Sequence, residues 1–204
     1  MASSPPPKLL AENANALKEW AAVCRALETG RQIILLRKGG IHERGGVFRA
    51  EHHEFWLYPT FEHQSRAQLL EEAWPWLDEA PHHFPKSQGQ IPFQLYAQVT
   101  AVKELASLEE ALALRGFHVW TEEVVRQRFD YRRPGLSLLV LRVYRLPQAH
   151  WLPDLPRYAG CRSWVELEHP LPTAGAQPVL DDHEYAAQLR ELSLRLPMGF
   201  QSSD

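Results

Sequence analysis

Residues 136–146 read Leu-Ser-Leu-Leu-Val-Leu-Arg-Val-Tyr-Arg-Leu, and this stretch decides the fold. Its centre, Leu138 to Leu141, consists of four consecutive apolar residues. Side chains of an extended chain alternate between two faces, so both faces of this segment are apolar. A strand of that kind is typical of the interior of a sheet that is covered on both sides. We therefore expect residues 136–146 to form a central strand.

Other segments supply further strands. Residues 91–101 alternate between apolar and polar side chains, residues 51–58 do the same, and Gln32 to Leu36 form a β-branched apolar run. We predict an N-terminal β-hairpin over residues 17–38, with its turn at Thr29-Gly30. The spacing of Leu17, Trp20, Cys24 and Leu27 also fits a helix, so the first half of that hairpin has a helical alternative.

Helices are indicated by capping signals followed by apolar residues at helical spacing. We predict helices that begin at the capping box of Ser65 and Gln68, with a kink at Pro75; at the capping box of Ser107 and Glu110; at Thr121; and at Asp181 or Asp182, ending before Pro197. The resulting order of elements predicts an α+β fold, with a single mixed sheet packed by several helices, an N-terminal β-hairpin and a C-terminal helix.

The domain organisation follows from where this pattern begins and ends. We expect a disordered tail over residues 1–8, one globular domain over residues 9–197, and a flexible tail over residues 198–204. The Pro- and Gly-containing stretch 170–180 is expected to be an internal linker before the C-terminal helix.

The composition limits the classes of protein to which the chain can belong. The 204 residues are 45% hydrophobic and 23% charged, which is typical of a globular chain. No apolar stretch approaches the roughly 20 residues of a membrane helix, and the N-terminus lacks the apolar run of a secretion signal. The two cysteines cannot form a disulfide framework or a CxxC zinc motif. We expect a cytoplasmic protein with no membrane partner.

Basic residues are segregated along the chain, although the net charge is −3. Residues 31–49 carry five basic side chains against one acidic, and residues 126–145 carry six against one. Aromatic residues interleave with the second segment, and such a mixture suits phosphates and stacked bases. We predict that the two segments meet in space. The candidate nucleic-acid-binding residues are Arg37, Lys38, Trp120, Arg126, Arg128, Arg132, Arg133 and Arg142.

Histidines concentrate between residues 42 and 83, which raises a second possibility, a metal site. His52 and Glu54 share one face if residues 51–58 form a strand, and Glu62 and His63 follow after the turn at Pro59. Two imidazoles and a carboxylate are a common set of transition-metal ligands. The metal candidates are therefore His52, Glu54, Glu62 and His63. The competing interpretation is that these are surface and core-edge side chains without a metal.

Several catalytic signatures are absent from the sequence. Gly40 and Gly45 have the spacing of a phosphate-binding loop, but Gly46 and Val47 stand where the loop needs Lys and Ser or Thr. There is no HExxH metal motif and no GxSxG nucleophile elbow. Whether the chain is an enzyme is left open.

Six short segments carry a resemblance to a known family, and they are Leu17 to Trp20, Leu36 to Ile41, Phe55 to Thr60, Val119 to Thr121, Leu141 to Tyr144 and Tyr158 to Trp164. Over roughly residues 16–168 the chain resembles the bacterial family called domain of unknown function 1802. Some relatives are linked to restriction-endonuclease-like domains, so the resemblance implies a connection with DNA processing or defence. It transfers no catalytic residue.

Our leading hypothesis is a nucleic-acid-associated accessory module that acts through the basic residues named above. The alternatives are a metal-dependent or small-molecule enzyme that uses the His/Glu cluster around residues 52–63, and a structural protein-interaction domain.

Overall fold

The central strand predicted from residues 136–146 is strand β5 of a seven-stranded mixed sheet. The structure is a computed structural model, and it describes residues 8–38, 52–85, 89–160 and 162–196. The strand order is β2-β5-β4-β3-β1-β6, with β7 also paired to β5. The strands are β1 (Glu12–Trp20), β2 (Ile34–Arg37), β3 (Glu54–Thr60), β4 (Gln90–Leu105), β5 (Leu136–Pro153), β6 (Trp164–Pro172) and β7 (Gln177–Pro178).

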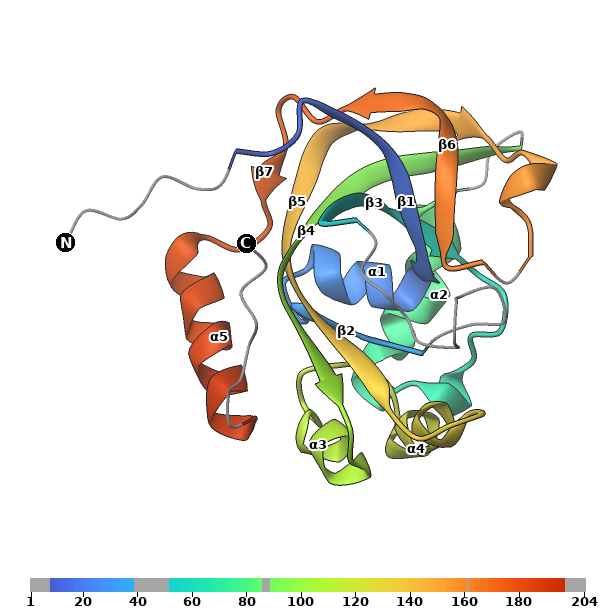
Figure 1. The fold of residues 1–204 in the computed structure, drawn as a ribbon. Coiled ribbons are helices and arrows are strands. Elements are labelled where there is room, and N and C mark those ends of the chain that lie inside the picture. Colours follow the sequence, from blue (N-terminus) through green and yellow to red (C-terminus); the bar gives the residue numbers. More distant parts are fainter. Residues whose placement is uncertain (1–7, 39–51, 86–88, 161, 197–204) are drawn as a thin grey trace.

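The sheet is mixed because β1 and β3 run parallel while the other pairs are antiparallel. In Figure 1 it curves strongly and arches over α1, with α3 and α4 at one end and α5 outside β5. The five α-helices are α1 (Ala21–Glu28), α2 (Trp74–His83), α3 (Leu108–Ala113), α4 (Glu122–Asp130) and α5 (Asp182–Arg195). This architecture confirms the α+β class. Among the described residues, no helix combines the length and the apolar character needed to cross a membrane.

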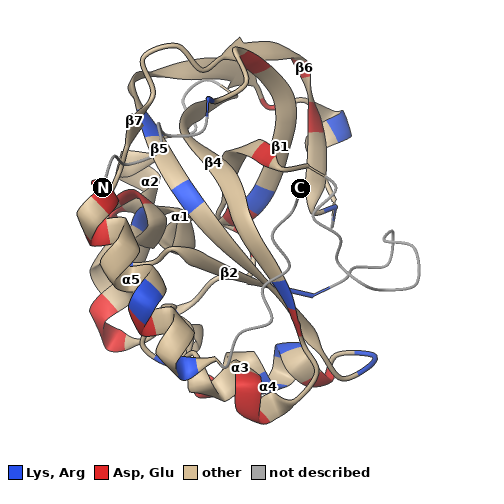
Figure 2. Ribbon diagram, turned by 60° about the vertical axis from the view of Figure 1, so that its left-hand side comes forward, with Lys and Arg blue, Asp and Glu red and all other residues tan. Residues whose placement is uncertain are grey.

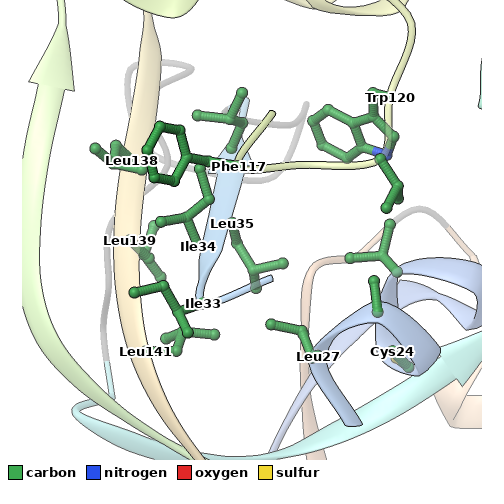
Figure 3. Close-up of a cluster of buried hydrophobic side chains, with 14 of the residues drawn as sticks. Cys24, Leu27, Ile33, Ile34, Leu35, Phe117, Trp120, Leu138, Leu139 and Leu141 are labelled. Carbon is green, nitrogen blue, oxygen red and sulfur yellow. The ribbon is translucent and has the colours of Figure 1, made fainter. Parts of the chain in front are cut away.

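Two clusters of buried hydrophobic side chains pack against the sheet. The larger cluster joins α1, β2, β5 and the segment before α4; Figure 3 labels Cys24, Leu27, Ile33, Ile34, Leu35, Phe117, Trp120, Leu138, Leu139 and Leu141 in it. The second is rich in aromatic rings and includes Trp56, Tyr58, Phe93, Tyr96, Tyr144 and Tyr158. Burial on both faces explains why the centre of β5 is apolar at every position, because none of Leu138 to Leu141 is exposed.

The predicted N-terminal hairpin is wrong. Helix α1 separates β1 from β2, and the two strands pair with different partners, β1 with β3 and β6, and β2 with β5. Residues 21–28, Ala-Ala-Val-Cys-Arg-Ala-Leu-Glu, are helical because three alanines favour a helix and the apolar side chains form one buried face. The helical spacing of Trp20, Cys24 and Leu27 was the informative pattern. Gly30 follows the helix with a φ of 70°, a conformation that suits glycine.

The helix predicted from Ser65 is also different in the structure. Residues 66–68 and 71–73 form short 3₁₀ turns, and Ser65 makes no cap to the backbone. Helix α2 begins only at Trp74, so Pro75 occupies the first turn, where proline is tolerated, and causes no kink. The capping box at Ser107 is confirmed, and the C-terminal helix starts as expected, with Asp181 as its N-cap.

The stretch expected to be a linker, residues 170–180, instead continues the sheet. β6 extends to Pro172, and β7 pairs with β5 through Gln177 and Pro178. Thr173 is buried and its backbone N–H donates to the carbonyl of Ala11. The prolines are compatible with this arrangement because β6 is an edge strand and β7 is only two residues long.

Candidate functional site

The two basic segments meet because β2 pairs with β5. Arg37, at the end of β2, lies opposite Ser137 at the start of β5, and α4 comes just before β5 in the chain. The prediction that the segments converge is therefore confirmed for the described residues. Arg44 and Arg49 lie outside the described residues.

The most distinctive side chain at this meeting point is Arg128 on α4. Its guanidinium carbon Cζ lies 3.8 Å from the ring centroid of Trp120 and 4.8 Å from that of Trp20. The two indoles meet edge to face, with their centroids 5.9 Å apart. Among the described residues, no acceptor hydrogen-bonds to this guanidinium and no carboxylate forms an ion pair with it, although the charge of Glu19 stabilises its cationic form. Burial lowers the pKa of Arg128 to about 10, so the group remains charged at neutral pH.

Helix α4 positions Arg128 by burying its neighbours. Val124, Val125 and Phe129 are buried, and Arg128 follows Val124 by four residues, so it lies along the same side of the helix. Trp120 precedes the N-cap of the helix, Thr121, and is 3% exposed. Cation–π contact with a tryptophan face stabilises a guanidinium without requiring a carboxylate.

Arg128 lines a cavity of about 380 Å³, which we call the arginine chamber. Its other lining residues are Lys18, Glu19, Trp20, Arg37, Lys38, Thr60, Gln127 and Tyr131. A second cavity of about 440 Å³, the tyrosine chamber, includes Tyr58, Glu62, His63, Asp154, Tyr158, Arg162 and Ser163. Lys18, Trp20, Arg37 and Thr60 line both chambers. The two chambers are therefore adjacent, and we call them together the cleft.

Fixed charges line the part of the cleft that the chambers share. Arg37 Nη1 donates to Glu19 Oε2 at 2.8 Å, and both side chains are largely buried. Arg37 also donates to the carbonyl oxygen of Lys18 at 3.1 Å. Lys18 Nζ donates to the carbonyl oxygens of Tyr158 and Gly160. Glu19 offsets the charge of Arg37, whereas no carboxylate of the described residues lies within ion-pair distance of Arg128.

Lys38 holds the end of α4. Its Nζ donates to the carbonyl oxygens of Phe129 at 2.8 Å and Gly135 at 2.7 Å, and also to that of Arg133. Burial lowers the pKa of Lys38, and the nearby Arg133 lowers it further. All three donors of this ammonium group are occupied, so its main role is to fix the wall that carries Arg128.

The other predicted arginines do not all join the cleft. Arg126 pairs with Glu122 on the exposed side of α4 at 2.7 Å. Arg132 lies over the ring of Tyr131, with its Cζ 5.0 Å from the centroid. Arg142 pairs with Asp182 at the start of α5 at 2.7 Å, and its Cζ is 4.6 Å from the Tyr185 centroid. Arg126 and Arg142, two of the candidate nucleic-acid-binding residues, therefore pair with carboxylates and do not line the cleft. Figure 2 likewise shows both signs of charge on α5.

The metal candidates are not brought together. Glu54 accepts hydrogen bonds from the backbone N–H of Leu10, the hydroxyl of Tyr96 and the side-chain amide of Gln98. The His52 ring lies edge to face with Trp164, and β3 begins only at Glu54, so the assumed strand face does not include His52. Within the described ranges, no group of three His, Cys, Asp or Glu side chains is placed to hold a metal. Glu62 and His63 instead line the tyrosine chamber.

Sequence reasoning missed Lys18, Trp20 and Arg162 as cleft residues, whereas Tyr131 was among the aromatic residues that interleave with the second basic segment. Lys18 and Trp20 belong to β1, whose last residues meet β3 and the end of β2 only in the folded chain. The one available signal was the segment Leu17 to Trp20, which contributes to the family resemblance. Its link to the basic segments required knowledge of the sheet order.

Comparison with known proteins places the chain in a family. Among solved structures, ASCH from Zymomonas mobilis is similar at 10% identity, with 93% of this chain and 97% of that chain covered and a TM-score of 0.43. A mutant of that protein is similar at 11% identity, with 87% and 96% covered and a TM-score of 0.44. No curated protein matches. The model of the family described as domain of unknown function (DUF1802) matches residues 16–191, and the chain belongs to that family.

Proposed function

We propose that this protein is a nucleic-acid-associated accessory module and that the cleft is its contact with the nucleic acid. The observation that carries the proposal is the guanidinium of Arg128, which lines the arginine chamber on two indoles and has no carboxylate or hydrogen-bond partner among the described residues. A guanidinium presents a planar set of N–H donors that matches two phosphate oxygens. Phosphate is therefore the ligand group that this position suits best.

Aromatic surface beside the cation supports a nucleotide over a simple inorganic anion. Tyr131 lines the same chamber, and 50% of it is exposed to solvent. An exposed ring next to a phosphate-binding cation is the combination that single-strand-binding proteins use, because every base has a face that can stack. Such a site recognises the nucleic-acid backbone and stacks bases without reading a particular sequence.

The family resemblance supports the cellular setting that we propose. Relatives linked to restriction-endonuclease-like domains suggest that this module serves DNA processing or defence. In that role it would hold nucleic acid while a separate protein or domain performs the chemistry.

Fluorescence anisotropy with labelled single-stranded DNA, single-stranded RNA and duplex DNA at low salt tests the proposal. We expect binding, and we expect Arg128→Gln to weaken it by about tenfold, since a hydrogen-bonded charge pair contributes about 1.5–3 kcal/mol. Arg126→Gln removes the same charge two residues away, on the exposed side, and should change affinity less than about twofold. Tyr131→Ala should also weaken binding.

Two results would decide against the proposal. The first is the absence of binding to any of the three nucleic acids at low salt. The second is equal loss of affinity in Arg128→Gln and Arg126→Gln, which would indicate a diffuse charge effect. Thermal melting of Arg128→Gln identifies a loss of fold, and in that case Arg128→Lys, which retains the charge but not the planar donor set, replaces it in the comparison.

A further inference from the structure

The two chambers of the cleft differ in chemistry. The arginine chamber combines Arg128 with the exposed ring of Tyr131. The tyrosine chamber presents hydroxyl, imidazole and carboxylate groups together, including Tyr58, His63 and Asp154. Cavities of roughly 300–1,000 Å³ are the usual size of small-molecule sites, and each chamber falls in that range. Each chamber is thus large enough for its own part of a ligand.

The tyrosine chamber suits a neutral polar group better than a second phosphate. The Tyr58 hydroxyl donates to Asp154 Oδ1 at 3.1 Å, and Glu62 adds a second carboxylate to the lining. Burial and the neighbouring Asp154 raise the pKa of Tyr58, so its hydroxyl keeps its proton. Glu62 and Asp154 weaken the attraction that Lys18 and Arg162 in the same lining exert on a phosphate, and the mixture of donors and acceptors matches the edge of a base or the hydroxyls of a sugar.

The chambers also share lining residues, so a ligand can extend from one to the other. Lys18 and Thr60 lie on the shared boundary, where Lys18 Nζ is 5.6 Å from the centroid of the Tyr58 ring. A ligand that extends from Arg128 into the tyrosine chamber therefore passes Lys18, a second cation. A cation followed by polar groups matches a phosphate followed by the next nucleoside of a strand.

We propose that the cleft binds a dinucleotide step of a single strand, with its phosphate at Arg128, one base on Tyr131 and the neighbouring nucleoside in the tyrosine chamber. This inference rests on the proposed function and specifies its ligand. A nucleoside that enters the tyrosine chamber must leave its pairing partner and its stack, which a strand in a duplex does only at a cost of unpairing. Single strands should therefore bind more tightly than duplexes.

The first experiment compares a ten-nucleotide single-stranded DNA with a blunt duplex of the same sequence by anisotropy. The wild-type protein should bind the single strand at least about tenfold more tightly. Ser163→Trp fills the tyrosine chamber without removing a charge and should reduce this preference to less than about threefold. His183→Trp places the same side chain at the exposed start of α5 and should leave the preference unchanged.

The second experiment uses calorimetry with short ligands. A 5′-phosphorylated dinucleotide should bind the wild-type protein at least about tenfold more tightly than a 5′-phosphorylated mononucleotide. In Ser163→Trp the two ligands should bind alike, because only the arginine chamber, with Arg128 and Tyr131, remains accessible. In Arg128→Gln both ligands should bind more weakly.

The outcomes separate the two proposals. Equal affinity for single strand and duplex, or an unchanged preference in Ser163→Trp, would overturn the dinucleotide inference and leave nucleic-acid binding in place. Absence of binding to every nucleic acid would overturn both. Melting curves of Ser163→Trp and His183→Trp check that both variants are folded; if Ser163→Trp is not, Ser163→Leu takes its place.

Discussion

Arg128 lies with its Cζ 3.8 Å from the ring centroid of Trp120, eight residues earlier in the chain. The contact joins the residue just before α4 to the last full turn of that helix, and Trp20 at the end of β1 completes it. Tryptophan faces attract a guanidinium by about 0.5–2 kcal/mol, depending on how far the pair is desolvated. The indoles therefore stabilise the position of Arg128 while its N–H donors remain available to a ligand.

Salt dependence gives the first prediction. If Arg128 contacts one phosphate, Arg128→Ala should reduce the slope of log K against log salt by about one unit, because one fewer counterion is released on binding. Arg126→Ala should leave the slope unchanged, because Arg126 lies outside the cleft and pairs with Glu122. Anisotropy titrations at several salt concentrations measure both slopes. A flattened slope in Arg126→Ala alone would contradict the assignment.

The second prediction concerns the buried ion pair between Arg37 and Glu19, which line the arginine chamber. Glu19→Ala should lower the free energy of unfolding by about 3–5 kcal/mol, because the Glu19 side chain is 1% exposed and its loss removes the carboxylate that pairs with the largely buried Arg37. Glu122→Ala breaks the exposed pair with Arg126 and should cost about 0.5 kcal/mol or less. Urea unfolding followed by circular dichroism compares the two. A loss of stability in Glu19→Ala as small as that expected for Glu122→Ala would show that the pair of Arg37 and Glu19 is not important for stability.

Gly30 gives the third prediction. Its φ of 70° favours glycine, and a Cβ at this position would lie 2.4 Å from Leu180 Cδ2. Gly30→Ala should therefore cost at least about 1–2 kcal/mol of backbone strain, plus the displacement of Leu180. Gly116 also has a positive φ, of 93°, but a Cβ there meets nothing within 4 Å, so Gly116→Ala isolates the strain. Thermal unfolding should rank Gly30→Ala as the less stable variant; the reverse order would refute the predicted clash.

The fourth prediction is a loss of stability in mild acid. Burial, and to a lesser extent the nearby Arg31, lower the pKa of His118 from its ordinary value of 6.5 to about 4. Between these values the unfolded chain binds the proton and the folded protein does not. The free energy of unfolding should therefore fall as the pH falls from 6.5 towards 4, by up to about 1.4 kcal/mol per unit for this one group.

His118→Asn tests that assignment. Asparagine does not titrate, and its side-chain oxygen can accept the hydrogen bond that the backbone N–H of Trp120 donates to His118 Nδ1. Urea unfolding between pH 4 and 7 should show a shallower decline in this variant than in the wild type. Parallel curves would assign the acid sensitivity to other groups.

Sequence patterns that span only a few residues correctly predicted several strands and helix starts. The apolar centre of β5, the alternation of β4, the capping box at Ser107 and the helix start at Asp181 are all set within a few residues, and the structure contains each of them. The prediction of an N-terminal hairpin was wrong because Gln32 to Leu36 has the pattern of a strand, and the residues before Thr29 were assigned as its hairpin partner. In the folded chain β2 pairs with β5, about a hundred residues away, and no local pattern encodes that choice.

The candidate site was predictable only in part for the same reason. Charge segregation indicated Arg37, Lys38 and Arg128, which do line one cavity. It could not separate Arg128 from Arg126, since that distinction depends on which side of α4 meets Trp20 and Trp120. The metal hypothesis failed for His52 and Glu54. Strand periodicity was assumed at His52, where β3 has not yet begun, and Glu54 accepts hydrogen bonds from Leu10, Tyr96 and Gln98.

Lys38 gives the cleft a dynamic property as well as a position. Its ammonium group ties the end of β2 to the carbonyls of Phe129, Arg133 and Gly135, and β2 is itself bonded to β5. Local opening of a protein follows such cooperative units and not single residues. The wall that carries Arg128 therefore cannot fray like an isolated nine-residue helix. Its amide protons should exchange together with those of the sheet.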